Sequence, residues 1–295
     1  TGPGNHLLTS DLDKLVANLQ VQRIDKYLFI GTSPKFPPRV FGGQVLAQAL
    51  NAASRTVEED RFAHSMHGYF LRPGNPKKQI VYEVDPIRDG RSFTTRRVVA
   101  KQDGIAIFNT SVSFQTMEDN FEHQIDMPRV TPPEELESDQ VYMDKLAKEY
   151  PERYGVPRST AIERRAVKLR DRINPQPQEP VQHYWFKANG TLDDDVRLHQ
   201  TVLAYISDMT LLGAALLPHP YSGDSPEMQC ASLDHALWFH RPVKVDEFLL
   251  YTQDIPCSAH TRGFSRGSFY TREGVLVASA VQESLVRYRG SEALS

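Results

Sequence analysis

VRLHQTVLAYISDMTLLGAALLPH, residues 196–219, contains the longest apolar run of this 295-residue chain. Apolar side chains fill nearly every position from Val202 to Leu217, so no face is left for solvent. A helix that is apolar on all sides is a buried one, and the pattern therefore predicts a buried helix at the centre of the fold. One carboxylate, Asp208, stands in the middle of this predicted helix.

Burying Asp208 in its ionised form is costly unless the carboxylate is paired or has a chemical task. Two interpretations stay open from this stretch alone. Asp208 either bonds a neighbouring backbone group or caps a kink, or it is a functional carboxylate with a perturbed pKa. Further along, QCASLDHALWFHRP at 229–242 places Ser232, Asp234 and His235 just before an aromatic strand.

The composition is typical of a soluble globular protein, with 40% hydrophobic and 24% charged residues. A net charge of −3 with interleaved signs gives no basic surface for nucleic acid or for a membrane. Cys230 and Cys257 are too few for a disulfide framework and lack metal-ligand spacing. No signal peptide opens the chain, and the apolar run is too short to span a bilayer. We expect a cytoplasmic protein without nucleic-acid or membrane partners.

One pattern of strand, long apolar helix and antiparallel meander occurs twice along the chain. The first copy is expected to have a strand at 25–31, a helix at 42–54 and strands within 67–115; the second has a strand at 182–188, the Asp208 helix and strands within 235–287. Three matches define the alignment: Val45-Leu46-Ala47 with Val202-Leu203-Ala204, Arg72-Pro73 with Arg241-Pro242, and Asp103-Gly104-Ile105 with Glu273-Gly274-Val275. The offsets, 202 − 45 = 157, 241 − 72 = 169 and 273 − 103 = 170, place one insertion after the second helix.

This repeat predicts an α+β fold. Each antiparallel sheet must cover its apolar face, and the long helix of its unit is the obvious cover. Two units side by side can join their sheets at the edges into one continuous sheet, which removes an exposed strand edge from each. We expect an N-terminal unit at 1–116, a Pro-rich, acidic linker with surface helices at 117–180, and a C-terminal unit at 181–295 that carries the functional residues.

The two halves differ where chemistry is expected. Asp208 falls opposite Asn51, an amide that can hold the same hydrogen bonds but cannot take up a proton. Gln282 falls opposite Ser113 or Val112. Ser232-Leu233-Asp234-His235 stands where the first half has Ala63-His64-Ser65-Met66. An acid, a hydroxyl and an amide are thus present in the second half only, which predicts one active site per chain.

Several long runs resemble the acyl-CoA thioesterase II family, the TesB-like thioesterases, and the resemblance extends in order from about residue 24 to 288. They are RVFGGQVLAQAL at 39–50, HSMHGYFLRPG at 64–74, ISDMTLLGAALLPH at 206–219, SLDHALWFHRP at 232–242, RGFSRGSFYT at 262–271 and GVLVASAVQESLVR at 274–287. The resemblance implies a double hotdog fold and a catalytic set of Asp208, Ser232 and Gln282. It also implies a homo-oligomer, a dimer or tetramer, and hydrolysis of acyl-CoA without a metal or redox cofactor, coenzyme A being part of the substrate. The bacterial pattern has Thr where this chain has Ser232.

Thioester hydrolysis needs a positioned water more than a strong nucleophile. Asp208 would act as general base on that water, with its pKa raised by apolar surroundings, and Ser232 and Gln282 would hold the water. Two alternatives remain: a non-catalytic acyl-CoA-binding sensor, and a hotdog enoyl-CoA hydratase. The hydratase would need a His near Asp208 on the helix, and none stands between Tyr205 and Leu217.

Two further motifs are interpreted as structural. Strict alternation along a strand puts residues three positions apart on opposite faces, so His235 is expected to point away from Ser232. A metal site at Asp234 and His235 lacks a third ligand at a sensible spacing. The pair Gly42-Gly43 is interpreted as a tight helix entry rather than a cradle for a phosphate of coenzyme A.

Overall fold

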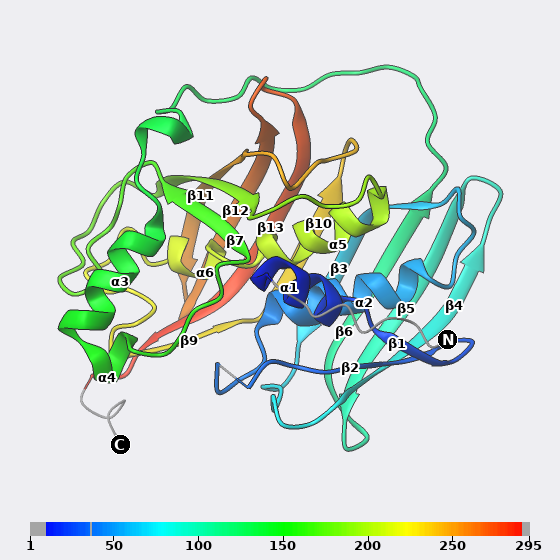
Figure 1. Ribbon diagram of the computed structural model, residues 1–295, viewed down its shortest axis with the longest axis horizontal. Coiled ribbons are helices and arrows are strands. Elements are labelled where there is room, and N and C mark those ends of the chain that lie inside the picture. Colours follow the sequence, from blue (N-terminus) through cyan, green and yellow to red (C-terminus); the bar gives the residue numbers. More distant parts are fainter. Residues whose placement is uncertain (1–9, 36, 291–295) are drawn as a thin grey trace.

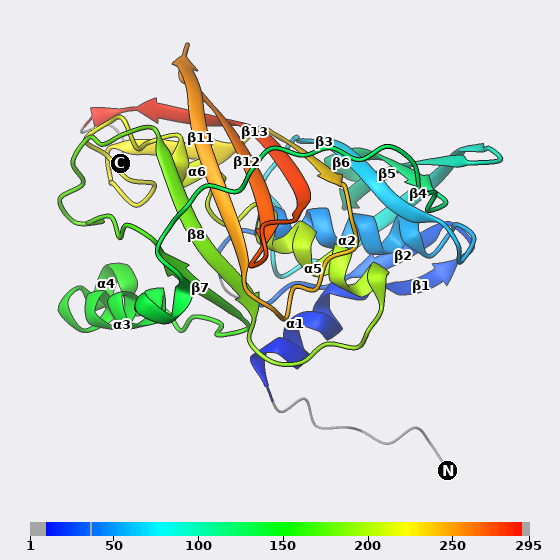
Figure 2. The same ribbon diagram turned by 90° about the horizontal axis from the view of Figure 1, so that it is seen from above.

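The computed structural model describes residues 10–35 and 37–290. One sheet of thirteen strands curves around two long helices, α2 (Gly42–Ser54) and α5 (Val196–Ser207), which lie side by side on its concave face (Figures 1 and 2). The strand order is β1-β2-β4-β5-β6-β3-β10-β13-β12-β11-β8-β7, and β9 pairs with β13. Neighbouring strands are antiparallel throughout this path, as expected for two helix-on-sheet units joined into one sheet.

The elements follow the predicted repeat. The first unit contains α1 (Asp11–Leu19), β1 (Gln22–Asp25), β2 (Leu28–Gly31), α2, β3 (Phe62–Phe70), β4 (Ile80–Asp89), β5 (Phe93–Gln102) and β6 (Ile105–Gln115). The second contains β8 (Val181–Ala188), α5, α6 (Leu211–Ala214), β9 (Met228–Ser232), β10 (Asp234–Phe239), β11 (Leu249–Ala259), β12 (Arg262–Thr271) and β13 (Leu276–Tyr288). The α+β double hotdog architecture is confirmed.

The segment between the units contains more than surface helices. It forms a 3₁₀ turn at Pro133–Glu135, the helices α3 (Asp139–Glu149) and α4 (Pro151–Tyr154), and the strand β7 (Ile162–Ala166). This strand, which the sequence did not predict, pairs with β8 and extends the sheet of the second unit. Met143, Leu146 and Tyr154 form a small core of their own beneath α3 and α4.

The junction of the two units lies at β3 and β10, where His67 pairs directly with Ala236. The difference 236 − 67 = 169 is the offset between the repeats, so these two residues are each other's counterparts. A local two-fold axis therefore passes between them. The alignment read from the sequence is a true spatial symmetry of the fold.

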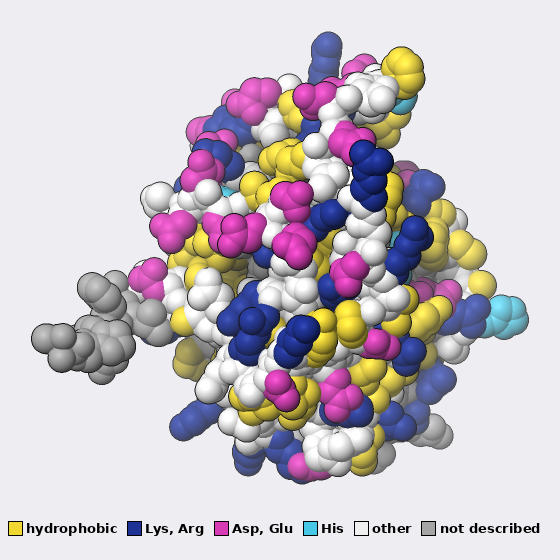
Figure 3. All heavy atoms as spheres, turned by 90° about the vertical axis from the view of Figure 1, so that its right-hand side faces the viewer, with side chains coloured by type: hydrophobic (Ala, Val, Ile, Leu, Met, Phe, Trp, Pro, Cys, Tyr) yellow, Lys and Arg dark blue, Asp and Glu magenta, His cyan; other side chains and the backbone are white. Residues whose placement is uncertain are grey.

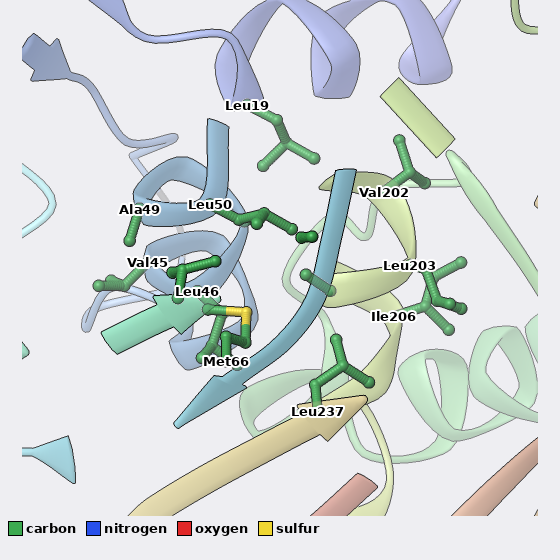
Figure 4. Packing of buried hydrophobic residues seen from close by; sticks show 14 of the residues in the cluster. Leu19, Val45, Leu46, Ala49, Leu50, Met66, Val202, Leu203, Ile206 and Leu237 are labelled. Carbon is green, nitrogen blue, oxygen red and sulfur yellow. The ribbon is translucent and has the colours of Figure 1, made fainter. Parts of the chain in front are cut away.

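The main core fills the space between the two helices and the sheet. Figure 4 shows Leu46 of α2 beside Met66 of β3, and Leu203 and Ile206 on α5, all members of this core. Burial of such side chains stabilises a fold by roughly 1.5–3 kcal/mol each, which explains why both helices are apolar on nearly all faces. Among residues 10–35 and 37–290, none of the helices has the length and hydropathy needed to cross a bilayer.

The prediction of a single long helix around Asp208 is wrong. Helix α5 ends at Ser207, Asp208 is its C-cap with φ −91° and ψ −2°, and the short α6 begins at Leu211. The apolar pattern continues across the break because α5 and α6 are both buried, α5 against α2 and α6 against β11, β12 and β13. A hydrophobic pattern reports burial, and here it could not report the change of direction.

Candidate active site

Asp208 lies where the C-terminus of α5 meets the N-terminus of α2. The break in the helix therefore places its carboxylate next to the first residues of α2. The side chain of Asp208 is only 4% exposed. A Cβ added to Gly42 would lie 2.6 Å from Oδ2 of Asp208, and the backbone N–H of Gly43 donates to the carboxylate. The absence of a side chain at Gly42 thus lets the carboxylate approach the positive end of α2. The Gly-Gly pair does more than provide a tight helix entry.

Ser232 and Gln282 reach Asp208 from the sheet. Ser232 Oγ lies 3.4 Å from Asp208 Oδ1, and Gln282 Nε2 donates to Ser232 Oγ at 2.9 Å. Gln282 is fully buried on β13 and also donates to Ser284 Oγ at 3.0 Å. The three residues expected to form the site are therefore brought together, from the end of α5, the end of β9 and the middle of β13.

His235 belongs to the same group, and its expected exclusion is wrong. Its Nδ1 lies 2.7 Å from Gln282 Oε1 and 4.0 Å from Asp208 Oδ1, and its Nε2 lies 2.9 Å from Ser207 Oγ. The imidazole is fully buried.

A β-bulge explains the error about His235. Ser232 pairs with Ser284, and Ala236 pairs with Val281. Four steps on one strand (236 − 232) thus face three on the other (284 − 281), so one extra residue is inserted between β9 and β10. A bulge interrupts the alternation of side chains, and residues three positions apart then face the same way. The signal available in the sequence was the same register comparison, which placed His235 opposite apolar Met66.

Burial controls the charges of the group. It raises the pKa of Asp208 to about 7, although hydrogen bonds from Ser232, the Gly43 backbone and Gln282 partly offset this rise. Burial also lowers the pKa of His235 to about 4, against a smaller opposite effect of its bond to Gln282. At neutral pH the imidazole is uncharged, and Asp208 is poised to exchange a proton.

A cavity of about 570 Å³ gives access to the group and is lined by Asp208, Ser232 and Gly42. A second cavity of about 310 Å³ shares Gly42 and Ser232. A third, of about 490 Å³, adjoins the first at Val40, Phe41 and Met209. Gln282 and His235 line none of these three; they lie behind Ser232. A bound molecule can therefore touch the acid and the hydroxyl, while the amide and the imidazole act from behind.

Comparison with known proteins shows the family of the chain. The family model described as acyl-CoA thioesterase matches residues 158–285, and the one described as its N-terminal domain matches residues 32–115. The chain is 39% identical to acyl-coenzyme A thioesterase 8 of Mus musculus, over 96% of this chain and 92% of the mouse protein. It is 36% identical to acyl-CoA thioesterase 2 of Haemophilus influenzae, over 94% and 98%. The chain belongs to the acyl-CoA thioesterase family.

Solved structures support the same family. The crystal structure of the acyl-CoA thioesterase II TesB2 from Mycobacterium marinum has a TM-score of 0.78 and 38% identity, and the match covers 94% of this chain and 99% of that one. A hot-dog-fold protein from Alicyclobacillus acidocaldarius, at 17% identity and a TM-score of 0.73 over 93% and 98%, shows the fold alone. Neither a sensor nor a hydratase is favoured by these matches; family membership makes the chain a thioester hydrolase.

Among the described residues of this thioesterase, the position related to the candidate site by the repeat lacks the corresponding acid and amide. The pairing of β6 with β3 and that of β13 with β10 make Val112 the counterpart of Gln282, which resolves the two options left by the sequence. Asn51 accepts a bond from the Val21 backbone. The offset of 157 makes His199 and Gln200 the counterparts of Gly42 and Gly43, which make room for Asp208. Side chains thus occupy the positions that must be empty for a carboxylate to approach.

Proposed function

We propose that the chain hydrolyses acyl-CoA thioesters to the free acid and coenzyme A, with Asp208 as the general base that activates water. The observation that carries this assignment is the position of Asp208, buried at the wall of a cavity with its pKa raised to about 7. A base whose pKa lies near the working pH combines a usable ionised fraction with good proton affinity. The reaction class follows from the family, and the roles of the residues are our proposal.

Ser232 and Asp208, which both face the cavity, would orient the water for attack on the thioester carbon. Asp208 accepts the proton, the water oxygen bonds to the thioester carbon, and the C–S bond then breaks to release the thiolate of coenzyme A, which takes up a proton. Gln282 acts through its bond to Ser232, because it is not exposed in the cavity. These steps require no metal or redox cofactor, and we propose that none is used.

The cavities suggest where the two ends of the substrate lie. The cavity of about 490 Å³ has an apolar wall that includes Leu15, Phe41 and Met209, which suits an acyl chain. The wall of the 570 Å³ cavity contains four arginines. Arg164 and Arg172 are neutralised by Asp139 and Asp224, a pairing that lowers their value as an anion site.

Two arginines of this wall keep their positive charge available. Within the described part of the chain, Arg39 and Arg170 form no ion pair that would neutralise them. Arg39 lines all three cavities at their common junction. We therefore assign the phosphate groups of coenzyme A to this side, because guanidinium groups bind phosphate through charge-assisted hydrogen bonds.

The partners and the compartment are proposals of the same kind. Within residues 10–35 and 37–290, no helix covers the convex face of the sheet (Figure 2), which exposes Tyr69, Phe93 and Ile105. We propose that this face packs on another copy in a homo-oligomer, which light scattering after size-exclusion chromatography would detect. Acidic and basic side chains are interspersed on the face in Figure 3, which supports a protein without a nucleic-acid partner. Both cysteines are free, which supports a reducing cytoplasm.

The test is thiol release from acyl-CoA esters by the wild type and by Asp208→Asn. Asparagine occupies the matching position in the first half as Asn51, so the size of the side chain is preserved. We expect loss of turnover by about 100-fold or more, with acyl-CoA still bound. Asp234→Asn is the matched control, since Asp234 accepts a bond from the Glu283 backbone and lies outside the three cavities. Full turnover by Asp208→Asn would place the base elsewhere.

A further inference from the structure

We propose that His235 is a positioning residue for the hydrolysis. Its Nδ1–H holds the amide oxygen of Gln282, so that the amide N–H groups face Ser232 and the hydroxyl proton of Ser232 is directed to Asp208. This inference rests on the proposed function, because it explains how the general base is held in its ionised form. Nothing in the composition of the cavity wall indicates it, since the imidazole is hidden behind Ser232.

The argument begins with the one proton of the Ser232 hydroxyl. An ionised carboxylate only accepts hydrogen bonds, so the contact of 3.4 Å between Ser232 Oγ and Asp208 Oδ1 requires the serine to donate. Ser232 Oγ has then used its proton, and it can only accept from Gln282 at 2.9 Å. Gln282 must therefore present its N–H₂ group, and not its carbonyl oxygen, to the serine.

The orientation of the Gln282 amide determines what faces His235. With Nε2 donating to Ser232 and Ser284, the carbonyl oxygen Oε1 points to the imidazole at 2.7 Å. A buried acceptor at that distance needs a donor, so Nδ1 of His235 carries the proton. In the opposite orientation, the amide oxygen would compete with Asp208 for the hydroxyl proton of Ser232.

The other imidazole nitrogen is held from α5. Ser207, the residue before Asp208, has its Oγ 2.9 Å from Nε2 of His235 and 2.7 Å from the Ala204 carbonyl. Ser207 Oγ donates to the Ala204 carbonyl, and in the neutral Nδ1–H tautomer this one hydroxyl proton is shared with Nε2, which also accepts. The Tyr251 hydroxyl, from β11, donates to the Ser207 carbonyl, so Ser207 is fixed on both sides.

The carboxylates near His235 would favour a charged imidazole, but they do not overcome the effect of its burial. Asp208 Oδ1 lies 4.0 Å from Nδ1, while Asp234 and Glu283, like the residue His235, line a separate cavity of about 240 Å³. Burial outweighs these groups and lowers the pKa of His235 to about 4. Tyr251, whose pKa burial raises well above its usual value, stays a neutral donor at the pH of the reaction.

The symmetry of the fold supports a joint role for the histidine and the amide. The offset of 169 makes Met66 the counterpart of His235, and Val112 is the counterpart of Gln282. The half that carries Asp208 has both polar residues, and the half that carries Asn51 has neither. Packing alone would be served in both halves by the apolar pair.

The first test reads the tautomer directly. In protein labelled with ¹⁵N-histidine, long-range ¹H–¹⁵N spectra near neutral pH distinguish the protonated from the bare ring nitrogen, and the signals of His235 are assigned by their loss in His235→Asn. We expect the proton on Nδ1 and a bare Nε2. A proton on Nε2 would overturn the proposal, because Gln282 would then face Ser232 with its oxygen.

The second test compares the activities of two variants, His235→Asn and His235→Leu. A purely structural role for His235 predicts the opposite order of these activities from the role proposed here. In His235→Asn, the side-chain amide nitrogen can occupy the place of Nδ1 and donate to Gln282, whereas His235→Leu fills the buried space without a donor. We expect His235→Leu to lower kcat by about 10- to 100-fold with KM changed less than about threefold, and His235→Asn to keep most of kcat. Equal losses in both variants, or a fully active His235→Leu, would overturn the role.

A double substitution separates this inference from the proposed function. If His235 acts through the amide, His235→Leu should have little further effect on kcat in a Gln282→Leu background. Full activity of Asp208→Asn would refute the general base itself, whereas an inactive Asp208→Asn with a fully active His235→Leu would refute only the role of His235. If His235→Leu fails to fold, the tautomer of the wild type still decides the question.

Discussion

Gly42 of the first unit and Asp208 of the second are in direct contact, and a Cβ on Gly42 would lie 2.6 Å from Asp208 Oδ2. The four polar residues of the site all come from the second unit, but the place that the carboxylate occupies is made by the first. Neither unit can therefore form the site alone. The joined sheet, with β3 paired to β10, holds the two in register.

Gly42→Ala should lower kcat/KM by about 10- to 100-fold, because the new methyl group displaces the Asp208 carboxylate or the ring of Phe70, which would be 3.0 Å away. Gly213→Ala is the matched control, since a Cβ there would meet nothing within 4 Å. Steady-state kinetics with one acyl-CoA and a thermal melt of each variant provide the comparison. Unchanged kinetics of Gly42→Ala would mean that the carboxylate position is not critical.

The rate should follow the ionisation of Asp208. Below its pKa of about 7 the base is protonated, so kcat/KM should fall about tenfold for each pH unit and should level off above that pKa. A disulfide reagent that detects thiol over a wide pH range allows the measurement from about pH 5 to about pH 9. A midpoint near 4 would show that Asp208 is solvated, and Asp234→Asn should leave the midpoint in place.

Ionisation of Asp208 should also lower the free energy of unfolding as the pH rises. Its pKa in the folded state is raised from 3.8 to about 7, so between these values the folded protein retains a proton that the unfolded chain releases. The free energy of unfolding then decreases with increasing pH. Asp208→Asn does not titrate, and its advantage over the wild type should grow across this window by up to about 4 kcal/mol.

Urea unfolding at several pH values measures this difference. His235 has the opposite effect: its pKa falls from 6.5 to about 4, so its contribution to stability is lost as the pH drops through that range. Since both proteins retain His235, its effect largely cancels in the comparison. A difference that is constant between about pH 4 and about pH 7 would contradict the raised pKa of Asp208.

Ser232 should tolerate only residues with a hydroxyl. Ser232→Ala removes the donor to Asp208 and the acceptor for Gln282, and kcat should fall about 10- to 100-fold. Ser232→Thr keeps the hydroxyl and stiffens χ1, so activity should stay within about threefold of the wild type. An active Ser232→Ala would show that the water is held by other groups.

The arginine side of the cavity can be tested with two substrates. Arg39→Met should raise KM for acyl-CoA by about tenfold, the effect of one charge-assisted hydrogen bond. It should leave KM unchanged for the S-acyl pantetheine that lacks the phosphate groups. Arg39 forms no ion pair among the described residues, so its replacement costs no such contact. Equal changes for both substrates would place the phosphates elsewhere.

The sequence by itself determined the repeat and the fold class, and it named three residues, Asp208, Ser232 and Gln282, that the fold brings together. Apolar periodicity located α2 and most of the strands, and the offset of 169 predicted the counterparts that the pairing of His67 with Ala236 makes visible. These signals are local: they depend on neighbours along the chain and survive without knowledge of what packs on them.

Tertiary structure alone decided the end of α5 at Ser207, the contact of Gly42 with Asp208, and the inclusion of His235. The end of α5 cannot be read from the sequence, because the residues on both sides of the break are buried. The second joins residues of different units, and no spacing along the chain encodes it. The third depends on one inserted residue between β9 and β10, which shifts the alternation only because β13 pairs with both. Hydrophobic patterns record how much water a residue loses on folding; the direction in which a side chain points is set by the partner strand.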